Sequence, residues 1–167
     1  MAGEIVNRVA KSPLITFDLE EHYPAGERKT LDLSQWLEQG FILREKEFRS
    51  ALKTFDFSPY KDAYVALYCS TEALLPAWAH LLVSIHLQQI AKKVVWGTLV
   101  DLETAIFQSL IEALDPTPYQ GKPVIIKGCT DKNIPATAYV ALVEKLQPHV
   151  KSLMYGEACS SVPLYKK

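Results

Sequence analysis

The stretch that decides the fold is YVALYCSTEALLPAWAHLLVSIHLQQIAKKVVWG, residues 64–97. It opens with a short apolar run rich in β-forming residues. It continues with apolar residues at helical spacing and closes with a second apolar run ended by Gly97. Pro76 would lie in the first helical turn, where a missing N–H costs little. The pattern predicts a strand, a helix and a second strand, which together make a βαβ unit.

The same alternation continues to residue 156. We predict strands over Tyr64–Cys69, Val94–Gly97, Pro123–Cys129 and Ser152–Gly156, and helices over Leu74–Lys93, Leu99–Leu114 and Ile134–Val150. Strands and helices that alternate in this way imply parallel pairing through right-handed crossovers. The predicted fold is therefore α/β, layered, with a mostly parallel sheet. Residues 1–60 are predicted to form an α+β extension packed on this core, within a single domain over residues 1–167.

An internal repeat supports the prediction. Residues 64–97 align with residues 124–156 when one gap is placed in the loop after the first strand. The most telling matches are Cys69 with Cys129, Pro76 with Pro135, and Gly97 with Gly156. The sequence therefore predicts a duplicated βαβ unit.

Composition narrows the classes of function. Apolar residues make up 49% and charged residues 22% of the chain, as in globular proteins. The formal net charge of -1 argues against a nucleic-acid binder, which would carry a basic excess. No stretch is long and apolar enough to span a membrane, and the N-terminus lacks the apolar segment of a signal peptide. We therefore expect a cytoplasmic protein that binds neither nucleic acid nor membrane; its oligomeric state is left open.

Three cysteines are the main candidates for a functional site. Cys69 and Cys129 each close a predicted strand just before a helix, and Cys159 follows the last predicted strand by three residues. The carboxyl ends of parallel strands meet at one edge of a sheet, where ligands bind in α/β folds. The sequence therefore predicts that all three thiols lie on one rim.

The first hypothesis for this rim is a metal site. A helix N-terminus favours the thiolate, which is the form that binds zinc or an iron–sulfur cluster. Three thiolates and one further ligand suit a tetrahedral site. Cys69, Cys129, Cys159 and Glu157 are the predicted ligands, although their spacing matches no known zinc motif.

Two alternatives stay open at this stage. In the first, one activated thiol, Cys129 or Cys159, serves a thiol-dependent enzyme or a persulfide carrier. In the second, the cysteines are core residues of a scaffold that docks a partner, because Cys is among the most buried residue types. The sequence contains no dinucleotide, phosphate-loop, zinc-protease or serine-hydrolase motif.

Several segments together resemble Domain of Unknown Function family 2480, a family of small bacterial proteins. They are NRVAKSPLITFDLEEHYP, WLEQGFILREKEFR, KKVVWG, VIIKGC and MYGEACSSVPLYKK, and they span essentially the whole chain. The resemblance implies a cytoplasmic, single-domain protein and transfers no catalytic residue. It also implies iron–sulfur assembly proteins as partners, which agrees with the predicted thiol site.

Overall fold

The computed structural model describes residues 13–167 and has the predicted α/β fold with mostly parallel strands. The chain divides into two compact units. The central unit contains residues Pro24–Ile106. The terminal unit contains the described residues up to Tyr23 together with Phe107–Lys167. Each unit has its own sheet and its own hydrophobic core.

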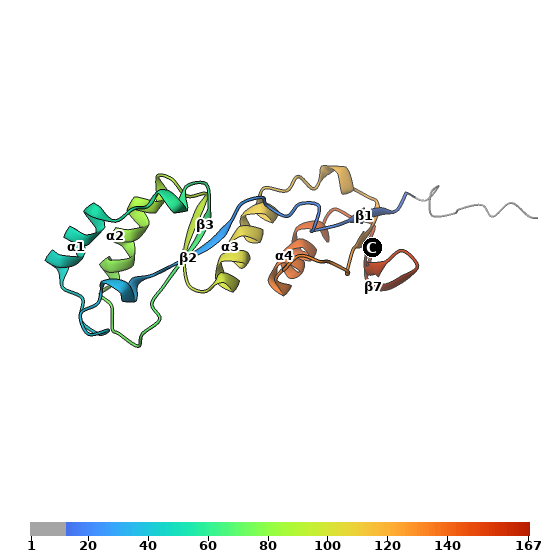
Figure 1. Cartoon of the computed structure of the whole chain (residues 1–167). Helices are drawn as coiled ribbons and strands as arrows, with labels where there is room; N and C mark the ends of the chain where they lie inside the picture. Colours follow the sequence, from blue (N-terminus) through green and yellow to red (C-terminus); the bar gives the residue numbers. More distant parts are fainter. Residues whose placement is uncertain (1–12) are drawn as a thin grey trace, which may run out of the picture. The chain divides into compact units, whose positions relative to one another are not determined.

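The central unit is a three-stranded parallel sheet between two helical layers (Figure 1). The strand order is β2 (Arg28–Asp32), β3 (Tyr64–Tyr68), β4 (Lys93–Trp96). Helices α1 (Glu45–Thr54) and α2 (Ala77–Gln88) cover one face. The beginning of α3 (Leu99–Glu112) covers the other face through Leu102 and Ile106. Short 3₁₀ turns, η1 (Leu33–Trp36) and η2 (Ser58–Tyr60), complete the unit.

The terminal unit is a four-stranded sheet in the order β1 (Ile15–Phe17), β5 (Pro123–Ile126), β6 (Ser152–Glu157), β7 (Ser160–Lys166). The first three strands are parallel and β7 pairs antiparallel with β6. Helix α4 (Ala136–Leu146) buries Ala138, Leu142 and Leu146 against the sheet. The 3₁₀ turn η3 (Thr117–Tyr119) leads into β5.

The predicted strands lie in two sheets, where the sequence analysis expected one. The reason lies in the N-terminal region. It supplies β1 to the terminal sheet and β2 to the central sheet, instead of forming an extension packed on one core. Each βαβ unit is thereby completed by its own parallel edge strand. The single domain over residues 1–167 stays a prediction.

The two units repeat the same architecture at a constant spacing of 59 residues. Strands β3 and β4 pair Tyr64 with Lys93, and strands β5 and β6 pair Pro123 with Ser152, so both crossovers span 29 residues (93 − 64 and 152 − 123). Further matched pairs are η2 and η3, Phe48 and Phe107, Asp56 and Asp115, Ala79 and Ala138, Val83 and Leu142, and Leu87 and Leu146. The duplication therefore extends from the first helix of each unit to its last parallel strand.

This register corrects the predicted alignment of the cysteines. When the two units are aligned by the register of their paired strands, no gap is needed. Cys69 then corresponds to Gly128, and Cys129 corresponds to Ser70. Hydrogen bonding of the backbone, rather than the shared cysteine, sets the equivalence. Cys129 therefore lies one position further along its repeat than Cys69 does.

Candidate functional site

An ion pair lies at the carboxyl end of the parallel strands of the terminal unit. Lys127 follows β5 and its Nζ lies 2.7 Å from Oδ2 of Asp18, which follows β1. The side chain of Asp18 is 10% exposed and that of Lys127 is 33% exposed. The other oxygen of Asp18 accepts a hydrogen bond of 2.9 Å from the backbone N–H of Glu20, which closes a tight turn. The pair therefore fixes the edge strand β1 against β5.

The local charges act on both partners. Burial alone would raise the pKa of Asp18, but the hydrogen bonds from Lys127 and Glu20 and the charges of Lys127 and His22 outweigh it. The pKa of Asp18 therefore lies below its ordinary value. The hydrogen bond with Asp18 raises the pKa of Lys127 despite some desolvation, and the carboxylates of Asp18, Glu157 and Glu20 add to that rise. Lys127 is therefore paired directly with Asp18, and the charges of Glu157 and Glu20 also act on it. We call Asp18, Glu20, Glu157 and Lys127 the carboxylate cluster.

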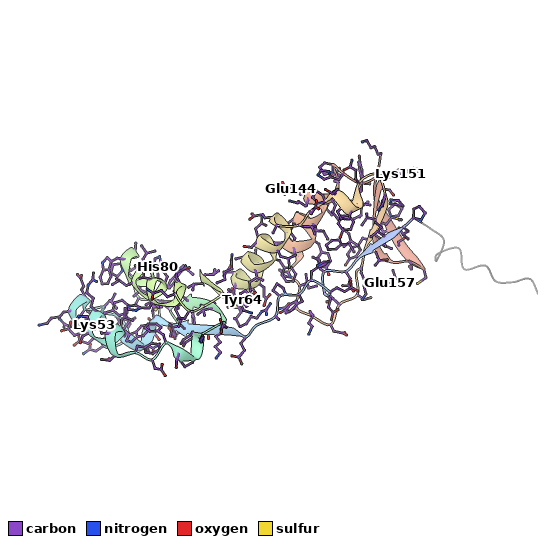
Figure 2. All side chains as sticks on the ribbon, turned by 90° about the horizontal axis from the view of Figure 1, so that it is seen from above. Lys53, Tyr64, His80, Glu144, Lys151 and Glu157 are labelled. Atoms are coloured by element: carbon purple, nitrogen blue, oxygen red, sulfur yellow. The ribbon has the colours of Figure 1, made fainter. Side chains whose placement is uncertain are left out.

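Glu157 has the most unusual environment of these carboxylates. It is the last residue of β6 (Figure 2), and its Oε1 is buried without a hydrogen-bond partner among the described residues. A buried acceptor without a donor costs about 1–3 kcal/mol. Such an atom is a natural point for a ligand to donate a hydrogen bond.

An apolar groove of about 360 Å³ lies between α4, β6 and β7. We call it the tyrosine groove; it is lined by Ile126, Tyr139, Val140, Val143, Tyr155 and Leu164. Several of these side chains are open to solvent, with Val140 69% and Leu164 50% exposed. The rings of Tyr139 and Tyr155 meet edge to face at 5.9 Å. The groove is therefore a preformed apolar surface with two phenol groups.

The tyrosine groove adjoins the carboxylate cluster. Burial raises the pKa of Tyr139, and the charges of Tyr155, Asp18 and Glu20 raise it further. The geometry agrees: a Cβ added at Gly128, the residue after Lys127, would lie 3.2 Å from the hydroxyl oxygen of Tyr155, so the residue after Lys127 lies against a ring that lines the groove. An apolar pocket with a few convergent polar groups and perturbed pKa values is the arrangement expected of a ligand site.

The predicted metal ligands are not gathered in this way. Cys69 follows β3 in the central unit, where its Sγ lies 3.3 Å from Thr71 Oγ1. Cys129 is exposed after β5 and Cys159 is exposed in the turn between β6 and β7. Glu157 ends β6 in the terminal unit, and its charge raises the pKa of Lys127.

Within residues 13–167, no group of three or more His, Cys, Asp or Glu side chains could hold a metal ion. The predicted metal-binding function is therefore wrong. Its physical cause is the division of the repeat between two sheets: Cys69 follows a strand of the central sheet, whereas the other two cysteines belong to the terminal unit. The zinc or iron–sulfur cofactor and the iron–sulfur assembly partners stay predictions without support from the structure.

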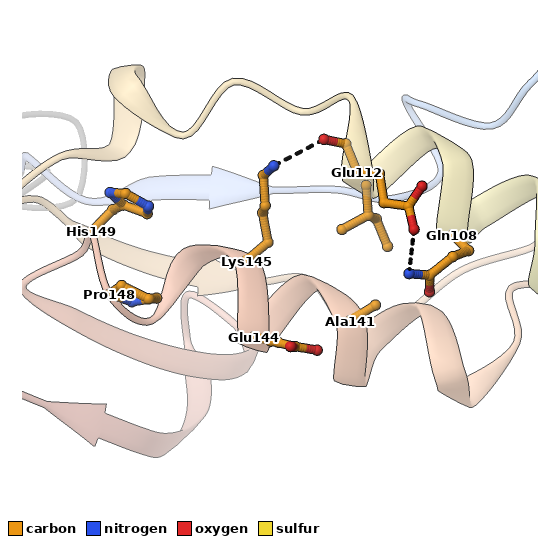
Figure 3. A pocket seen from close by; sticks show the side chains of 8 residues that line it. Gln108, Glu112, Ala141, Glu144, Lys145, Pro148 and His149 are labelled. Carbon is orange, nitrogen blue, oxygen red and sulfur yellow. Dashed lines mark hydrogen bonds between the residues drawn. The ribbon is translucent and has the colours of Figure 1, made fainter.

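Two other hollows have weaker claims to function. A hollow of about 430 Å³ in the central unit contains Cys69, His80 and Trp96, and its lining includes no Asp, Glu, Lys or Arg from the described part of the chain. A hollow of about 410 Å³ between the ends of α3 and α4 is polar, but two of its polar side chains already bond to Glu112 (Figure 3). Lys145 Nζ donates to the carbonyl oxygen of Glu112, and Gln108 donates to the Glu112 carboxylate. The first bond caps the last carbonyl of α3, and the second is a side-chain pair within that helix.

A comparison with protein-family models shows to which family the chain belongs. The family model described as "Protein of unknown function (DUF2480)" matches residues 3–167. The chain belongs to the DUF2480 family. The search of curated proteins found no match, and neither did the search of solved structures. Over residues 13–167 of this DUF2480 protein, no helix has the length and apolar character needed to cross a membrane.

The residues that the sequence analysis missed are Asp18, Lys127, Tyr139 and Tyr155. A signal for the first of them was present: TFDL at residues 16–19 and TLDL at residues 30–33 are the edge strands of the two units. Asp18 and Asp32 each accept a 2.9 Å hydrogen bond from the backbone N–H two residues ahead. This pair of motifs lies outside the aligned βαβ repeat and so was not recognised.

Asp18→Asn should reduce the dependence of stability on acid pH. Because the folded state lowers the pKa of Asp18, the ionised group stabilises the folded chain above its unfolded pKa of about 3.9. That contribution is lost as pH falls through the folded pKa. The difference in unfolding free energy between wild type and variant should therefore be constant above about pH 5 and shrink below about pH 4.

Urea denaturation over a series of pH values measures this difference. Glu21→Gln is the control, because Glu21 is an exposed carboxylate of the same turn region. It should keep the wild-type profile. An Asp18→Asn profile that runs parallel to wild type through the whole acid limb would contradict the prediction.

Proposed function

We propose that this protein binds a small amphipathic cation, with an apolar or aromatic body in the tyrosine groove and an amine at the carboxylate cluster. The observation that carries the proposal is the buried Oε1 of Glu157, which has no hydrogen-bond partner within residues 13–167, together with the open apolar groove of the same unit. An ammonium group would supply the missing donor. The predicted location of this activity is the cytoplasm.

Charge favours a cation over an anion. The charges of Asp18, Glu157 and Glu20 act on Lys127, and Asp18 also feels the charge of His22, so carboxylates outnumber cationic groups in these interactions. An anionic head would be repelled by three carboxylates, and a neutral head would forgo the charge-assisted hydrogen bond. Such bonds contribute about 1.5–3 kcal/mol, which decides between ligands with the same apolar body.

The apolar body has a matching surface. A groove of about 360 Å³ accepts a bicyclic aromatic ring, and burial of one aromatic side chain of that kind is worth about 1.5–3 kcal/mol. Tyr139 and Tyr155 offer ring faces and edges for stacking. A small cation without an apolar body should therefore bind much more weakly.

Isothermal titration calorimetry with 2-naphthylmethylamine and 2-naphthylacetate tests the proposal, because the two probes share a ring system and differ in head charge. The amine should bind with a Kd about tenfold lower or more, equivalent to about 1.4 kcal/mol. Glu157→Gln should reduce this preference without abolishing binding of the ring. Equal affinities for the two probes would refute the proposal.

The internal duplication supplies a matched pair of groove variants. Val140→Lys places a cation at the groove, and Leu81→Lys places the same charge at the equivalent exposed position of α2. The first should weaken binding of the amine about tenfold or more, whereas the second should leave it unchanged. Loss of binding in both variants would show that the probe does not use the tyrosine groove.

A further inference from the structure

The outer edge of β4 differs from the equivalent edge of its duplicate. In the terminal unit, β6 has β5 on one side and β7 on the other. In the central unit the order β2, β3, β4 leaves β4 at the edge of the sheet. The two strands are equivalent at the spacing of 59 residues, so β4 lacks the antiparallel neighbour that its counterpart has. Edges of this kind are templates for pairing with another chain.

The backbone of β4 is oriented for such pairing. The N–H of Gly97 donates to the carbonyl of Leu67 at 2.8 Å. Because backbone groups alternate along a strand, those of Val94 and Trp96 point away from β3. Their equivalents in β6 are Leu153 and Tyr155, which lie opposite Tyr165 and Val162 of β7. The β4 edge thus presents the positions that β7 engages in the duplicate.

Apolar side chains remain exposed in the layers that adjoin this edge. Trp96 is 46% exposed, and its ring lies 4.8 Å from His80 on α2. Leu81, next to His80, is 54% exposed. On α3, which packs on the other face, Val100 is 63% exposed. In the terminal unit, Leu164 of β7 lines the groove beside the equivalents of His80 and Trp96. Nothing in the described part of the central unit takes its place.

We propose that β4 pairs antiparallel with β4 of a second copy of the chain and joins the two central sheets. In the proposed register, a twofold axis perpendicular to the sheet passes beside Val95. Val95 then lies opposite the second copy's Val95, and Val94 lies opposite the second copy's Trp96. This register uses all four outward-facing backbone groups of each strand and gives four inter-strand hydrogen bonds. The cross-strand pairs are aromatic with β-branched and β-branched with β-branched, which favour strand pairing.

Charge complementarity supports a second copy of the chain as the partner that pairs with the β4 edge. The register places Lys93 opposite the second copy's Gly97. The Asp101 carboxylate lies against Gly97, since a Cβ added there would be 2.5 Å from Asp101 Oδ2. This register places the oppositely charged residues Lys93 and Asp101 of the two copies on the same face of the joined sheet, twice by symmetry. The net charge of -1 adds little repulsion between copies.

Sedimentation equilibrium of the full chain tests the proposal. The wild type should be a dimer of 18.8 kDa chains. Val94→Pro should be monomeric, because proline removes an N–H that points away from β3 and is tolerated at such edge positions. Leu164→Lys, a charge at an exposed position of β7, should stay dimeric. Circular dichroism confirms that each variant is folded.

A second variant covers the case in which Val94→Pro does not fold. Trp96→Lys keeps the backbone and places a charge at the proposed interface; it should shift the equilibrium to monomer, with a Kd for dimer dissociation raised about tenfold or more. A monomeric wild type would overturn the proposal. So would a folded Val94→Pro or Trp96→Lys variant that keeps the wild-type dimer affinity.

Discussion

Phe107→Ala should lower the free energy of unfolding of the terminal unit by about 3–5 kcal/mol, and Phe48→Ala should do the same to the central unit. The two phenylalanines are equivalent in the duplication and are 0% and 1% exposed. Each lies in the core of its own unit, and the two cores share no residue. We therefore expect each truncation to act on one unit alone.

The distribution of tryptophan makes the two effects separable. Trp36, Trp78 and Trp96 all belong to the central unit, so tryptophan fluorescence reports its unfolding, whereas far-ultraviolet circular dichroism reports both units. In urea, Phe107→Ala should shift part of the dichroism transition and leave the fluorescence midpoint at its wild-type value. Phe48→Ala should shift the fluorescence midpoint.

Coincident shifts by both probes in both variants would contradict separate unfolding. They would instead support the predicted single domain over residues 1–167. Val140→Ala is the control, because Val140 is 69% exposed and its truncation should change stability by no more than about 0.5 kcal/mol.

The elements of this fold could be predicted from the sequence because most of them carry a local signal. The runs before Cys69 and Cys129 are apolar and β-forming, and both crossover helices bury residues at a spacing of four. The last strand, β7, was not predicted. Pro163 within SSVPLYK argues against a strand, but it is tolerated here because β7 is an edge strand.

The candidate site could not be predicted because it depends on pairing between distant segments. Asp18 and Lys127 are 109 residues apart in the sequence, with the whole central unit between them. They meet because β1 pairs with β5. Hydrophobic periodicity indicates that a segment forms a strand, but it does not indicate which other strand it pairs with. The shared cysteine suggested a one-residue gap in the repeat, whereas backbone register showed that Lys127 is equivalent to Tyr68.

A second large effect on the free energy of unfolding is expected at the buried ion pair of the central unit. Arg28 Nε lies 2.7 Å from Glu103 Oε1, and the two side chains are 15% and 7% exposed. The same guanidinium donates to the carbonyl oxygens of Pro24 and Gly26 at 2.7 Å each. It also lies over the ring of Tyr64, 4.9 Å from the centroid. This arginine therefore ties the loop before β2 and the start of α3 to the sheet.

Glu103→Ala should lower the free energy of unfolding of the central unit by about 3–5 kcal/mol, because the buried Arg28 charge loses its carboxylate. The control is Glu45→Ala, which removes the carboxylate of the exposed pair with Arg49 on α1 and should cost only about 0.3–0.5 kcal/mol. Tryptophan fluorescence in urea measures both, since both pairs belong to the central unit.

A double variant separates the cost of an isolated charge from the value of the pair. Arg28→Met with Glu103→Leu replaces both charges by apolar groups, and such exchanges are often neutral or stabilising. The double variant should therefore be more stable than Glu103→Ala, although Arg28 also loses its bonds to two carbonyl groups. If Glu103→Ala costs no more than Glu45→Ala, water reaches the guanidinium and the pair does not hold α3 to the sheet. If the double variant is the less stable one, the bonds from Arg28 to the loop before β2, and not its pairing with Glu103, are what stabilise the unit.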